Sequence, residues 1–353
     1  MKGQAPVYFM EKRWETLDIL KCICAFGVIS IHRGFPGDAG MYLKIFFRFA
    51  VPVFFMITGF FYSDTIRKGK QKKQILKILR IGILANLFYF VWDLFVVYYY
   101  GTGNIQEKLQ KLLTPEKIRD LLITNESPFR SHLWYLGAIL YVLILAAWLV
   151  KKEKQYWMLI LTPFLLAGDL IFGKYSILLW NQEIDYIYVR NYLFVGIPYF
   201  AIGWALGIHK EKKLEKSRWW KGLLFLAGGA VFTWTSFYER RYLESVQANA
   251  PREHYISTTF LTVCVFCVFL CWAGFYKRRI LTGFFAWLGR NCATMIYILH
   301  PAVITVMDLY LKDGTDPWSM AYSTYAPVLI FACTAIISMI LFGVKNILIK
   351  ILQ

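Results

Sequence analysis

The sequence predicts an all-α protein built as a polytopic bundle of about ten transmembrane helices. Composition is the first observation behind this prediction: of 353 residues, 58% are hydrophobic and 18% aromatic, and the mean hydropathy is +0.46. In a soluble domain only about half of the residues are apolar. The other two observations are a series of long apolar runs and the charge of the segments between them. Finding no internal repeat, we expect one membrane-embedded domain over residues 1–353, in the plasma membrane.

The apolar runs locate the helices. A helix needs about 20 mainly apolar residues to cross a bilayer. Ten runs of roughly this length follow one another along the chain: 17–35, 42–62, 78–99, 133–150, 157–173, 189–208, 219–237, 256–276, 284–307 and 325–349. The fifth is the shortest and contains Asp169. No pattern of a removable signal peptide precedes them, so we expect the first run to be retained.

The charge between the runs gives each helix a direction. A net charge of +18 is compatible with nucleic-acid binding, but Lys and Arg lie in short stretches between apolar runs, which is typical of the positive-inside rule. We therefore expect no nucleic-acid partner. The basic segments, predicted to be cytoplasmic, are 66–80, 151–154, 210–221 and 277–279. The mixed-charge segments, predicted to face outward, are 101–132, 174–188, 238–255 and 312–324. An even number of helices places both termini in the cytoplasm.

Two further patterns refine this picture. The outer segment from Ile105 to Ile123 is amphipathic at helical spacing, so it is expected to lie on the outer membrane surface or to cap a cavity. All seven cysteines lie in apolar runs and offer no disulfide framework. Cys264, Cys267 and Cys271 share a helical stripe, which packing explains better than a metal site. No metal is expected.

Ionisable side chains inside membrane helices are costly and usually line a cavity or a pathway, so each is a functional candidate. They are Asp18, Lys21 and His32 in the first run, Arg48, Asp93, Asp169, Arg290 and His300 in later runs, and Arg80, His132 and Arg190 at the ends of runs.

The first run is the most informative. Lys21 and His32 are eleven residues apart, which places them on one helix face and about 16 Å apart along the axis. Asp18 precedes Lys21 by three residues, so the two can form an ion pair. Because of their separation, Lys21 and His32 cannot form an acid–base pair. We expect them to serve opposite ends of one path.

The predicted orientation separates two groups of side chains. Toward the cytoplasmic end lie Lys21, Arg80 and Arg290, a basic mouth suited to a phosphate-bearing donor. Toward the outer end lie Arg190 and three histidines, His32, His132 and His300. Imidazole is the usual group for moving a proton near neutral pH.

Structural explanations compete with these functional ones. His132 and His300 can be interfacial residues, and Arg80 can be a cytoplasmic anchor. Asp93 and Asp169 can simply bond to a neighbouring helix. The rings of Trp134, Tyr135 and Tyr297 can belong to aromatic belts, and His209 and His254 receive no role.

The motifs in order resemble the type-3 family of membrane acyltransferases, and they cover nearly the whole chain. They are the stretch from Arg13 through Lys21 to His32, Pro52 to Phe60, the basic stretch ending at Arg80, His132-Leu-Trp134-Tyr135, Pro198 to Gly203, Leu288-Gly289-Arg290-Asn291, and Tyr297-Ile-Leu-His300. The chain departs from the family in having Lys21 where Arg is frequent, and in lacking a Pro after Arg80. Neither the hydrolase-like domain nor the racemase domain of some relatives is expected here.

The resemblance implies an enzyme that moves an acyl group, most often acetyl, from cytoplasmic acyl-CoA to a hydroxyl of an envelope glycan or other small acceptor. The residues implied are His32, Lys21 and Asp18 for catalysis, Arg80, Arg290 and Asn291 for the donor, and His132, Trp134, Tyr135, Arg190, Tyr297 and His300 on the acceptor side. The bilayer, acyl-CoA and the acceptor are the expected partners, and a homodimer is left open. His32 would act as a general base or as an acyl carrier.

Two other classes stay in view. Because some relatives are fused to a serine racemase, the alternative is a transporter or binding protein for a small polar solute such as an amino acid. Paired helix interruptions in two halves would favour transport, and the sequence has none. An inactive scaffold for envelope assembly is disfavoured by the presence of both Lys21 and His32.

Overall fold

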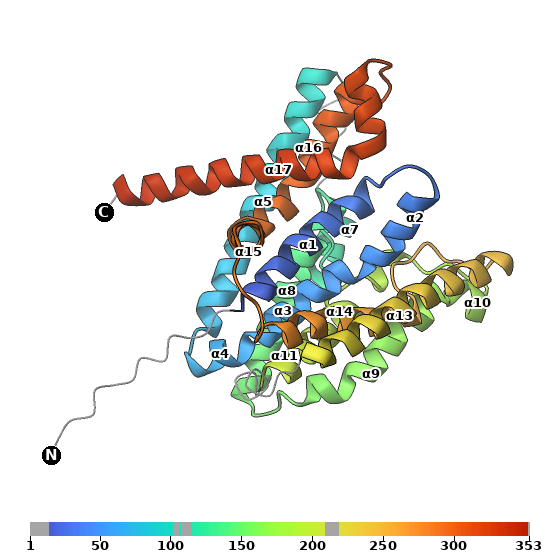
Figure 1. Cartoon of the computed structure of the whole chain (residues 1–353), viewed down its shortest axis with the longest axis vertical. Helices are drawn as coiled ribbons and strands as arrows, with labels where there is room; N and C mark the ends of the chain where they lie inside the picture. Colours follow the sequence, from blue (N-terminus) through green and yellow to red (C-terminus); the bar gives the residue numbers. More distant parts are fainter. Residues whose placement is uncertain (1–13, 102–105, 107–109, 111–113, 209–218, 352–353) are drawn as a thin grey trace.

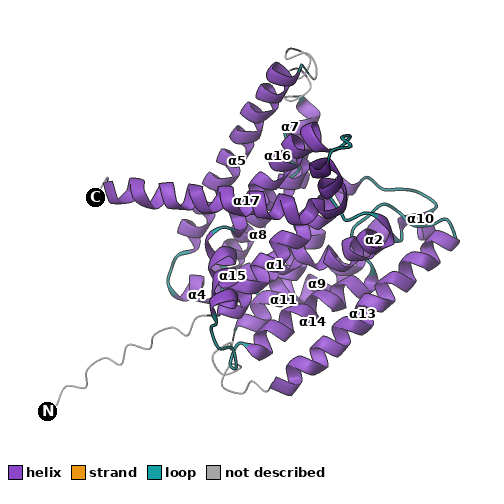
Figure 2. Cartoon of the chain, turned by 45° about the horizontal axis from the view of Figure 1, so that its top comes forward, coloured by secondary structure: helices purple, strands orange, loops and turns teal. Residues whose placement is uncertain are grey.

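The computed structural model describes residues 14–101, 106, 110, 114–208 and 219–351. Within these ranges the chain consists of helices and connecting loops, without a strand, as Figure 2 shows. The predicted all-α class is therefore confirmed. Six helical segments are long and apolar enough to span a membrane: Gly37–Arg67, Gln71–Tyr100, Ser131–Lys151, Trp157–Lys174, Ala293–Leu311 and Pro317–Leu348. Shorter apolar segments are Tyr192–Gly207 and Ile256–Trp272.

Figure 1 shows the order of the described helices along the chain. Those of the first half are α1 (Glu15–His32), α2 (Gly37–Phe46), η1 (Phe47–Phe49), α3 (Ala50–Phe60), α4 (Tyr62–Arg67), α5 (Gln71–Tyr100), α7 (Pro115–Thr124), η2 (Ser131–Leu133), α8 (Trp134–Lys151) and α9 (Trp157–Asp169). Those of the second half are η3 (Leu170–Lys174), α10 (Ser176–Trp180), η4 (Tyr186–Tyr188), η5 (Tyr192–Gly196), α11 (Ile197–Gly207), α13 (Trp219–Ser245), α14 (Ile256–Trp272), α15 (Ile280–Asn291), α16 (Ala293–Leu311) and α17 (Pro317–Ile351).

Every predicted apolar run contains helix, but the expectation of one continuous ninth helix over 284–307 is wrong. The chain breaks at Cys292, which separates α15 from α16. Just before the break, the Asn291 amide donates to the carbonyl of Trp287, so a side chain occupies an acceptor of the last turn. The fifth run, 157–173, coincides with the apolar helical segment Trp157–Lys174, whose last turn is π-helical and contains a non-helical Gly173. Ten crossings and cytoplasmic termini stay predictions.

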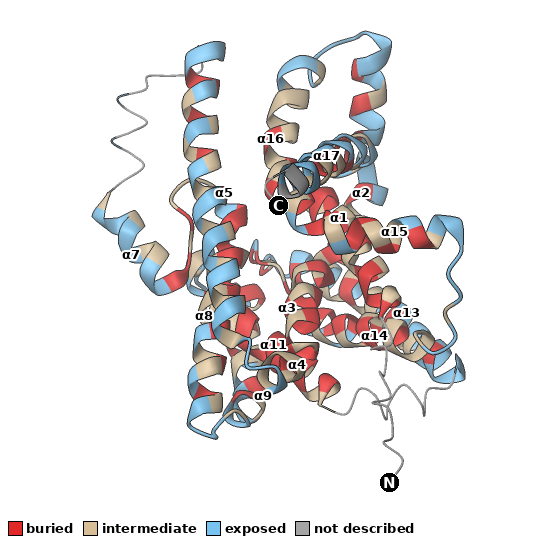
Figure 3. Ribbon diagram, turned by 90° about the vertical axis from the view of Figure 1, so that its left-hand side faces the viewer, coloured by how far each residue is buried: buried red, intermediate tan, exposed pale blue. Residues whose placement is uncertain are grey.

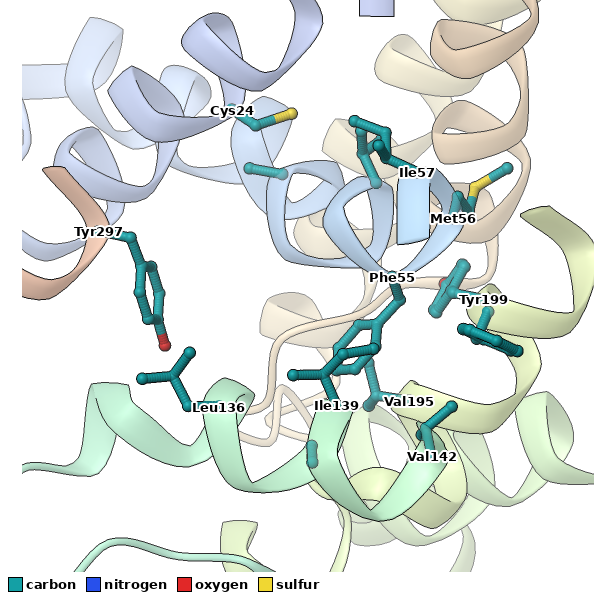
Figure 4. Packing of buried hydrophobic residues seen from close by; sticks show 14 of the residues in the cluster. Cys24, Phe55, Met56, Ile57, Leu136, Ile139, Val142, Val195, Tyr199 and Tyr297 are labelled. Carbon is teal, nitrogen blue, oxygen red and sulfur yellow. The ribbon is translucent and has the colours of Figure 1, made fainter. Parts of the chain in front are cut away.

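Helix α1 forms the centre of the packing. One side, with Leu17, Leu20 and Val28, joins a hydrophobic cluster shared with α3, α8, α11 and α14, part of which Figure 4 shows. Its other side, with Cys22 and Ile29, joins a second cluster shared with α15, α16 and α17. A helix that is apolar on both sides is buried. The polar side chains of α1 are therefore held inside the bundle.

Glycines allow α3 and α11 to approach closely. A Cβ atom on Gly59 of α3 would stand 2.0 Å from the carbonyl oxygen of Phe200, and one on Gly203 of α11 would stand 2.0 Å from that of Met56. Small residues at such contacts are the usual means of helix association in lipid. The predicted motifs that contain Gly59 and Gly203 thus take part in helix packing.

The outer faces of several helices are apolar and exposed. Leu84 of α5, Phe164 of α9 and Trp234 of α13 are 64%, 71% and 74% exposed, and Figure 3 shows the exposed outer side of α5. Exposed apolar faces on long helices fit contact with lipid chains.

Three segments predicted to face outward meet at one end of the bundle. Arg252 pairs with Glu183 at 3.1 Å, and Arg190 contacts Glu126 at 3.4 Å and Glu253 at 3.5 Å. These pairs connect 101–132, 174–188 and 238–255. Of the amphipathic segment, 115–124 is the helix α7, whereas 105, 107–109 and 111–113 lie outside the described residues, as does 210–218 of a basic segment.

Candidate active site

Three histidines from distant parts of the sequence form one cluster. His32 ends α1, His132 lies in η2, and His300 lies within α16. The ring centroid of His32 is 5.1 Å from that of His300 and 6.5 Å from that of His132, and the latter two are 5.4 Å apart. The sequence predicted that these residues share one level of the membrane, and the structure brings them together.

A proline fixes the orientation of His300. Pro301 has no N–H group to donate to the carbonyl of Tyr297, four residues earlier, so that carbonyl lacks its helical partner. The Nδ1 atom of His300 lies 2.8 Å from this carbonyl oxygen. A carbonyl only accepts, so Nδ1 carries the proton and Nε2 of a neutral ring has a free lone pair.

Tyrosines hold the frame around the cluster. The hydroxyl of Tyr297 donates to the backbone carbonyl of His132, and that of Tyr89 donates to the carbonyl of Ile298 at 2.6 Å. The first bond ties α16 to η2, which carries His132, and the second ties α16 to α5. Tyr135 packs edge-on against Tyr297, with ring centroids 5.5 Å apart, and Tyr297 points toward α8 in Figure 4. Tyr135 and Tyr297, both predicted to lie on the acceptor side, are thus neighbours.

The three histidines differ in their exposure to solvent. His132 and His300 are 5% and 0% exposed, whereas the side chain of His32 is exposed. The Nε2 atoms of both His132 and His300 are buried and have no hydrogen-bond partner. A buried nitrogen without a partner is costly. The cluster therefore offers an accessible imidazole backed by two nitrogens able to bond to a substrate or relay a proton.

A series of ion-paired side chains lies beside the histidine cluster. Glu253 accepts from Arg48 at 3.2 Å and from Arg190 at 3.5 Å, and Arg190 also contacts Glu126 at 3.4 Å. The guanidinium carbon of Arg190 lies 5.5 Å from the ring centroid of Trp134, next to His132 in sequence. The predicted acceptor-side residues Trp134 and Arg190 therefore contact each other.

The two carboxyl groups in this series of ion pairs have pKa values that are shifted in opposite directions. Burial would raise the pKa of Glu253, but the positive charges of Arg48 and Arg190 outweigh burial and lower it to about 2. At Glu126 burial prevails over Arg190 and raises the pKa to about 6. Glu253 is thus a permanent anion, whereas Glu126 titrates close to neutral pH.

A cavity of about 170 Å³ extends from Arg190 and Glu253 to Asp169 and His254. Nδ1 of His254 lies 2.8 Å from Oδ2 of Asp169, and both side chains are buried. Asp169 was a candidate from the sequence, but His254 received no role, and Glu253 and Glu126 were not singled out. The signal was available in part, because an Asp within a membrane run requires a partner. Several outer segments carry suitable residues, so the sequence did not identify which one.

The predicted cytoplasmic end holds a second polar group. Nζ of Lys21 lies 3.0 Å from Oδ1 of Asp18, so the predicted ion pair is present. A Cβ atom on Gly289 of α15 would stand 1.9 Å from the backbone oxygen of Asp18. Gly289 thus allows α15 to touch α1 at the turn that carries Lys21.

The other predicted donor residues are only partly brought together. Arg290 follows Gly289 beside α1 and is exposed, but Asn291 bonds within its own helix. Arg80 is exposed on α5, which packs mainly against α8, and α5 stands apart from α15 in Figure 3. A donor site formed by all three is therefore a prediction that the helix packing does not by itself assemble. Within the described residues, no three His, Cys, Asp or Glu side chains are placed to hold a metal ion.

Comparison with known proteins decides the family. Residues 14–344 match the family model of the type-3 acyltransferases, described as an acyltransferase domain. The chain belongs to the type-3 acyltransferase family. A protein named amino-acid racemase from Enterococcus faecalis is 24% identical over 370 residues, covering 96% of this chain and 47% of its own length. This acyltransferase-family chain thus spans about half of that relative. No solved structure matches it.

Proposed function

We propose that the protein transfers an acyl group, most often acetyl, from cytoplasmic acyl-CoA to a hydroxyl of an envelope glycan or other small acceptor on the outer side of the plasma membrane. The observation that carries this proposal is the accessible His32 in front of two buried histidines. Membership in the acyltransferase family supports it. The transferred group, the donor and the acceptor belong to the proposal alone.

In the proposed reaction, a nitrogen of His32 takes the proton of the acceptor hydroxyl. The hydroxyl oxygen attacks the thioester carbonyl carbon, the carbon–sulfur bond breaks, and the coenzyme A thiolate leaves and is then protonated. As an alternative, the imidazole itself accepts the acyl group and passes it to the hydroxyl. The buried Nε2 atoms of His132 and His300 would orient the hydroxyl or receive its proton.

The length of α1 implies two separate sites, one for the phosphates of the donor and one for the acceptor hydroxyl. Lys21, with Arg290 and Arg80, would bind the coenzyme A phosphates, about 16 Å from His32 along the axis. The thioester arm would therefore extend along α1 toward the histidines. A Lys21→Ala change should weaken use of acyl-CoA, whereas unchanged donor affinity would assign Lys21 to packing.

A transport function is the second candidate, because the relative from Enterococcus faecalis is named an amino-acid racemase. Purified full-length protein incubated with labelled acetyl-CoA tests the first candidate by release of free thiol or labelling of the protein. Uptake of labelled serine into proteoliposomes tests the second. We expect acyl turnover that His32→Ala abolishes and no serine uptake; uptake without turnover would overturn the proposal.

A further inference from the structure

A second cavity, in which half of the lining residues are cations, lies next to the ion-paired residues beside the histidines. Its volume is about 330 Å³, within the usual range of about 300–1,000 Å³ for small-molecule sites. Its lining includes Lys44, Arg48, Lys174, Arg240 and Arg252, and no acidic residue. These five come from α2, η1, η3, α13 and the loop before α14, so the fold gathers them from distant positions.

The nearby carboxylates neutralise only part of this charge. Arg48 pairs with Glu253, Arg240 with Glu244 and Arg252 with Glu183, at 3.2, 2.6 and 3.1 Å. A further acid, Glu239, receives hydrogen bonds from the Tyr175 hydroxyl and from the first two N–H groups of α14. In the described part of the chain, Lys44 and Lys174 have no ion-pair partner.

Lys174 is the most unusual of these cations. It is only 4% exposed, and its ammonium donates to Oδ1 of Asn249 at 3.1 Å and to the carbonyl of Ala250 at 2.7 Å. The ring of Tyr255 lies beneath it, with the centroid 4.6 Å from Nζ. All three partners are neutral. A buried cation normally has a counter-charge, and here the cavity provides the space for one.

This cationic cavity adjoins the candidate active site. Arg48 lines the cavity and pairs with Glu253, whose other oxygen contacts Arg190. Glu253, Arg190, Arg48 and Lys44 are also close enough to His32 to act on it electrostatically. If the hydroxyl of an acceptor lies at His32, other groups of the same acceptor molecule can therefore reach the cavity.

We propose that this cavity binds an oxyanion, a phosphate or carboxylate group, carried by the acceptor, so that the substrate is an anionic saccharide or a similar hydroxylated anion. The role of the bound anion as part of the acyl acceptor rests on the proposed acyl transfer, whereas the binding of an anion in the cavity does not. Two uncompensated cations in a cavity supply the attraction, and the three paired arginines offer further N–H groups. Neutral glycans would lack this interaction and bind more weakly.

The test measures anion binding to purified full-length protein in neutral detergent, without acyl-CoA. Titration calorimetry with inorganic phosphate and with glucuronate, against glucose as the neutral control, should show binding of at least one anion, weakened by added salt. Lys44→Gln should lower the affinity about tenfold, as expected for loss of one charged contact. The matched control is Lys312→Gln, an exposed lysine at the end of α16 that does not line the cavity. It should bind like the unmodified protein.

Because Lys174 is buried, a substitution there can also disturb folding, so the anion affinity of Lys174→Gln is compared with that of Lys174→Arg. Lys174→Arg keeps the charge and should retain more affinity for the anion. Preference for phosphate or for glucuronate would identify the kind of anion. Absence of binding by both anions, equal affinity in Lys44→Gln, or displacement of glucuronate by coenzyme A at this cavity would overturn the proposal. Anion binding without acyl turnover would instead refute the acyltransferase activity and leave the anion site intact.

Discussion

Arg190 contacts two glutamates whose pKa values shift in opposite directions, although Arg190 lowers both, which makes the two glutamates a matched pair for testing the ion pairs. Glu253 has a second cation, Arg48, and its pKa is lowered to about 2. Glu126 shares Arg190 alone among cations, and burial raises its pKa to about 6. At pH 7 we therefore expect ionisation of Glu253 to stabilise the fold and ionisation of Glu126 to oppose it.

Glu253→Gln should reduce stability at pH 7 by about 2 kcal/mol, because it leaves Arg48 and Arg190 without their shared anion. The lowered pKa gives a stabilisation present above the unfolded value of 4.5 and lost as pH falls toward about 2. The difference in melting temperature between variant and unmodified protein in detergent should thus narrow below pH 4.5. A difference that does not depend on pH would contradict the ion pairs.

Glu126→Gln should have the opposite effect. A raised pKa means that the carboxyl group opposes folding as pH rises from 4.5 through about 6. The variant should melt at the same or a higher temperature than the unmodified protein at pH 7, and the two should converge below pH 4.5. Strong destabilisation at pH 7 would show that the pair with Arg190 outweighs burial.

Pro301 offers a test of the orientation of His300. Pro301→Ala restores an N–H group that competes with Nδ1 of His300 for the carbonyl of Tyr297. Helix stability should be unchanged or higher, because Ala is the better helix former. Acyl turnover should fall about tenfold, the size expected for a misplaced proton carrier. Melting temperature and turnover, measured together, separate this from a folding defect. Unaltered turnover would remove His300 from the proposed mechanism.

At the scale of elements, the contact of α1 with α15 depends on Gly289. Gly289→Leu would place a side chain against the backbone of Asp18, so the helices must separate. We expect a stability loss of about 3 kcal/mol or more and weaker use of acyl-CoA. Gly82→Ala on α5 is the control, since a Cβ atom there meets nothing within 4 Å. The control should be neutral or stabilised, as judged by melting temperature. Equal effects of both changes would contradict the packing.

Helix positions could be predicted because long apolar runs can satisfy backbone hydrogen bonds in lipid only as helices. The predicted ninth helix failed at Cys292 because the run stays apolar across the break, and hydropathy contains no signal for a change of direction. Similarly, the π turn after Asp169 depends on local backbone geometry at Gly173. Such interruptions follow from tertiary packing.

Residues of the site that belong to one helix could be predicted from the sequence better than partners that come from loops. The spacing of Asp18, Lys21 and His32 follows from helix geometry within one run, and the Asp18–Lys21 pair is present. The meeting of His32 with His132 and His300 required only that three helix ends share one level. The partners Glu253 and His254 come from a loop, whose path hydropathy does not constrain. The cationic cavity was not anticipated because its five cations come from distant segments that only tertiary packing brings together.

For the molecule as a whole, the proposed transfer requires a path along α1 from a donor on the Lys21 side to an acceptor on the His32 side. The outer segments meet around the histidines, whereas Glu15, at the start of α1, pairs with Arg278 of a predicted cytoplasmic segment at 3.5 Å. The two ends of α1 therefore lie among segments of opposite predicted sidedness. Under the proposed function, we expect acyl transfer to run from the cytoplasmic to the outer side.

The most direct test uses proteoliposomes with labelled acetyl-CoA trapped inside and an envelope polysaccharide, too large to enter, outside. We expect labelled polysaccharide outside the vesicles, no labelling with His32→Ala, and reduced labelling with Lys21→Ala. Labelling that requires donor and acceptor on the same side, or that persists in His32→Ala, would contradict the proposed transfer.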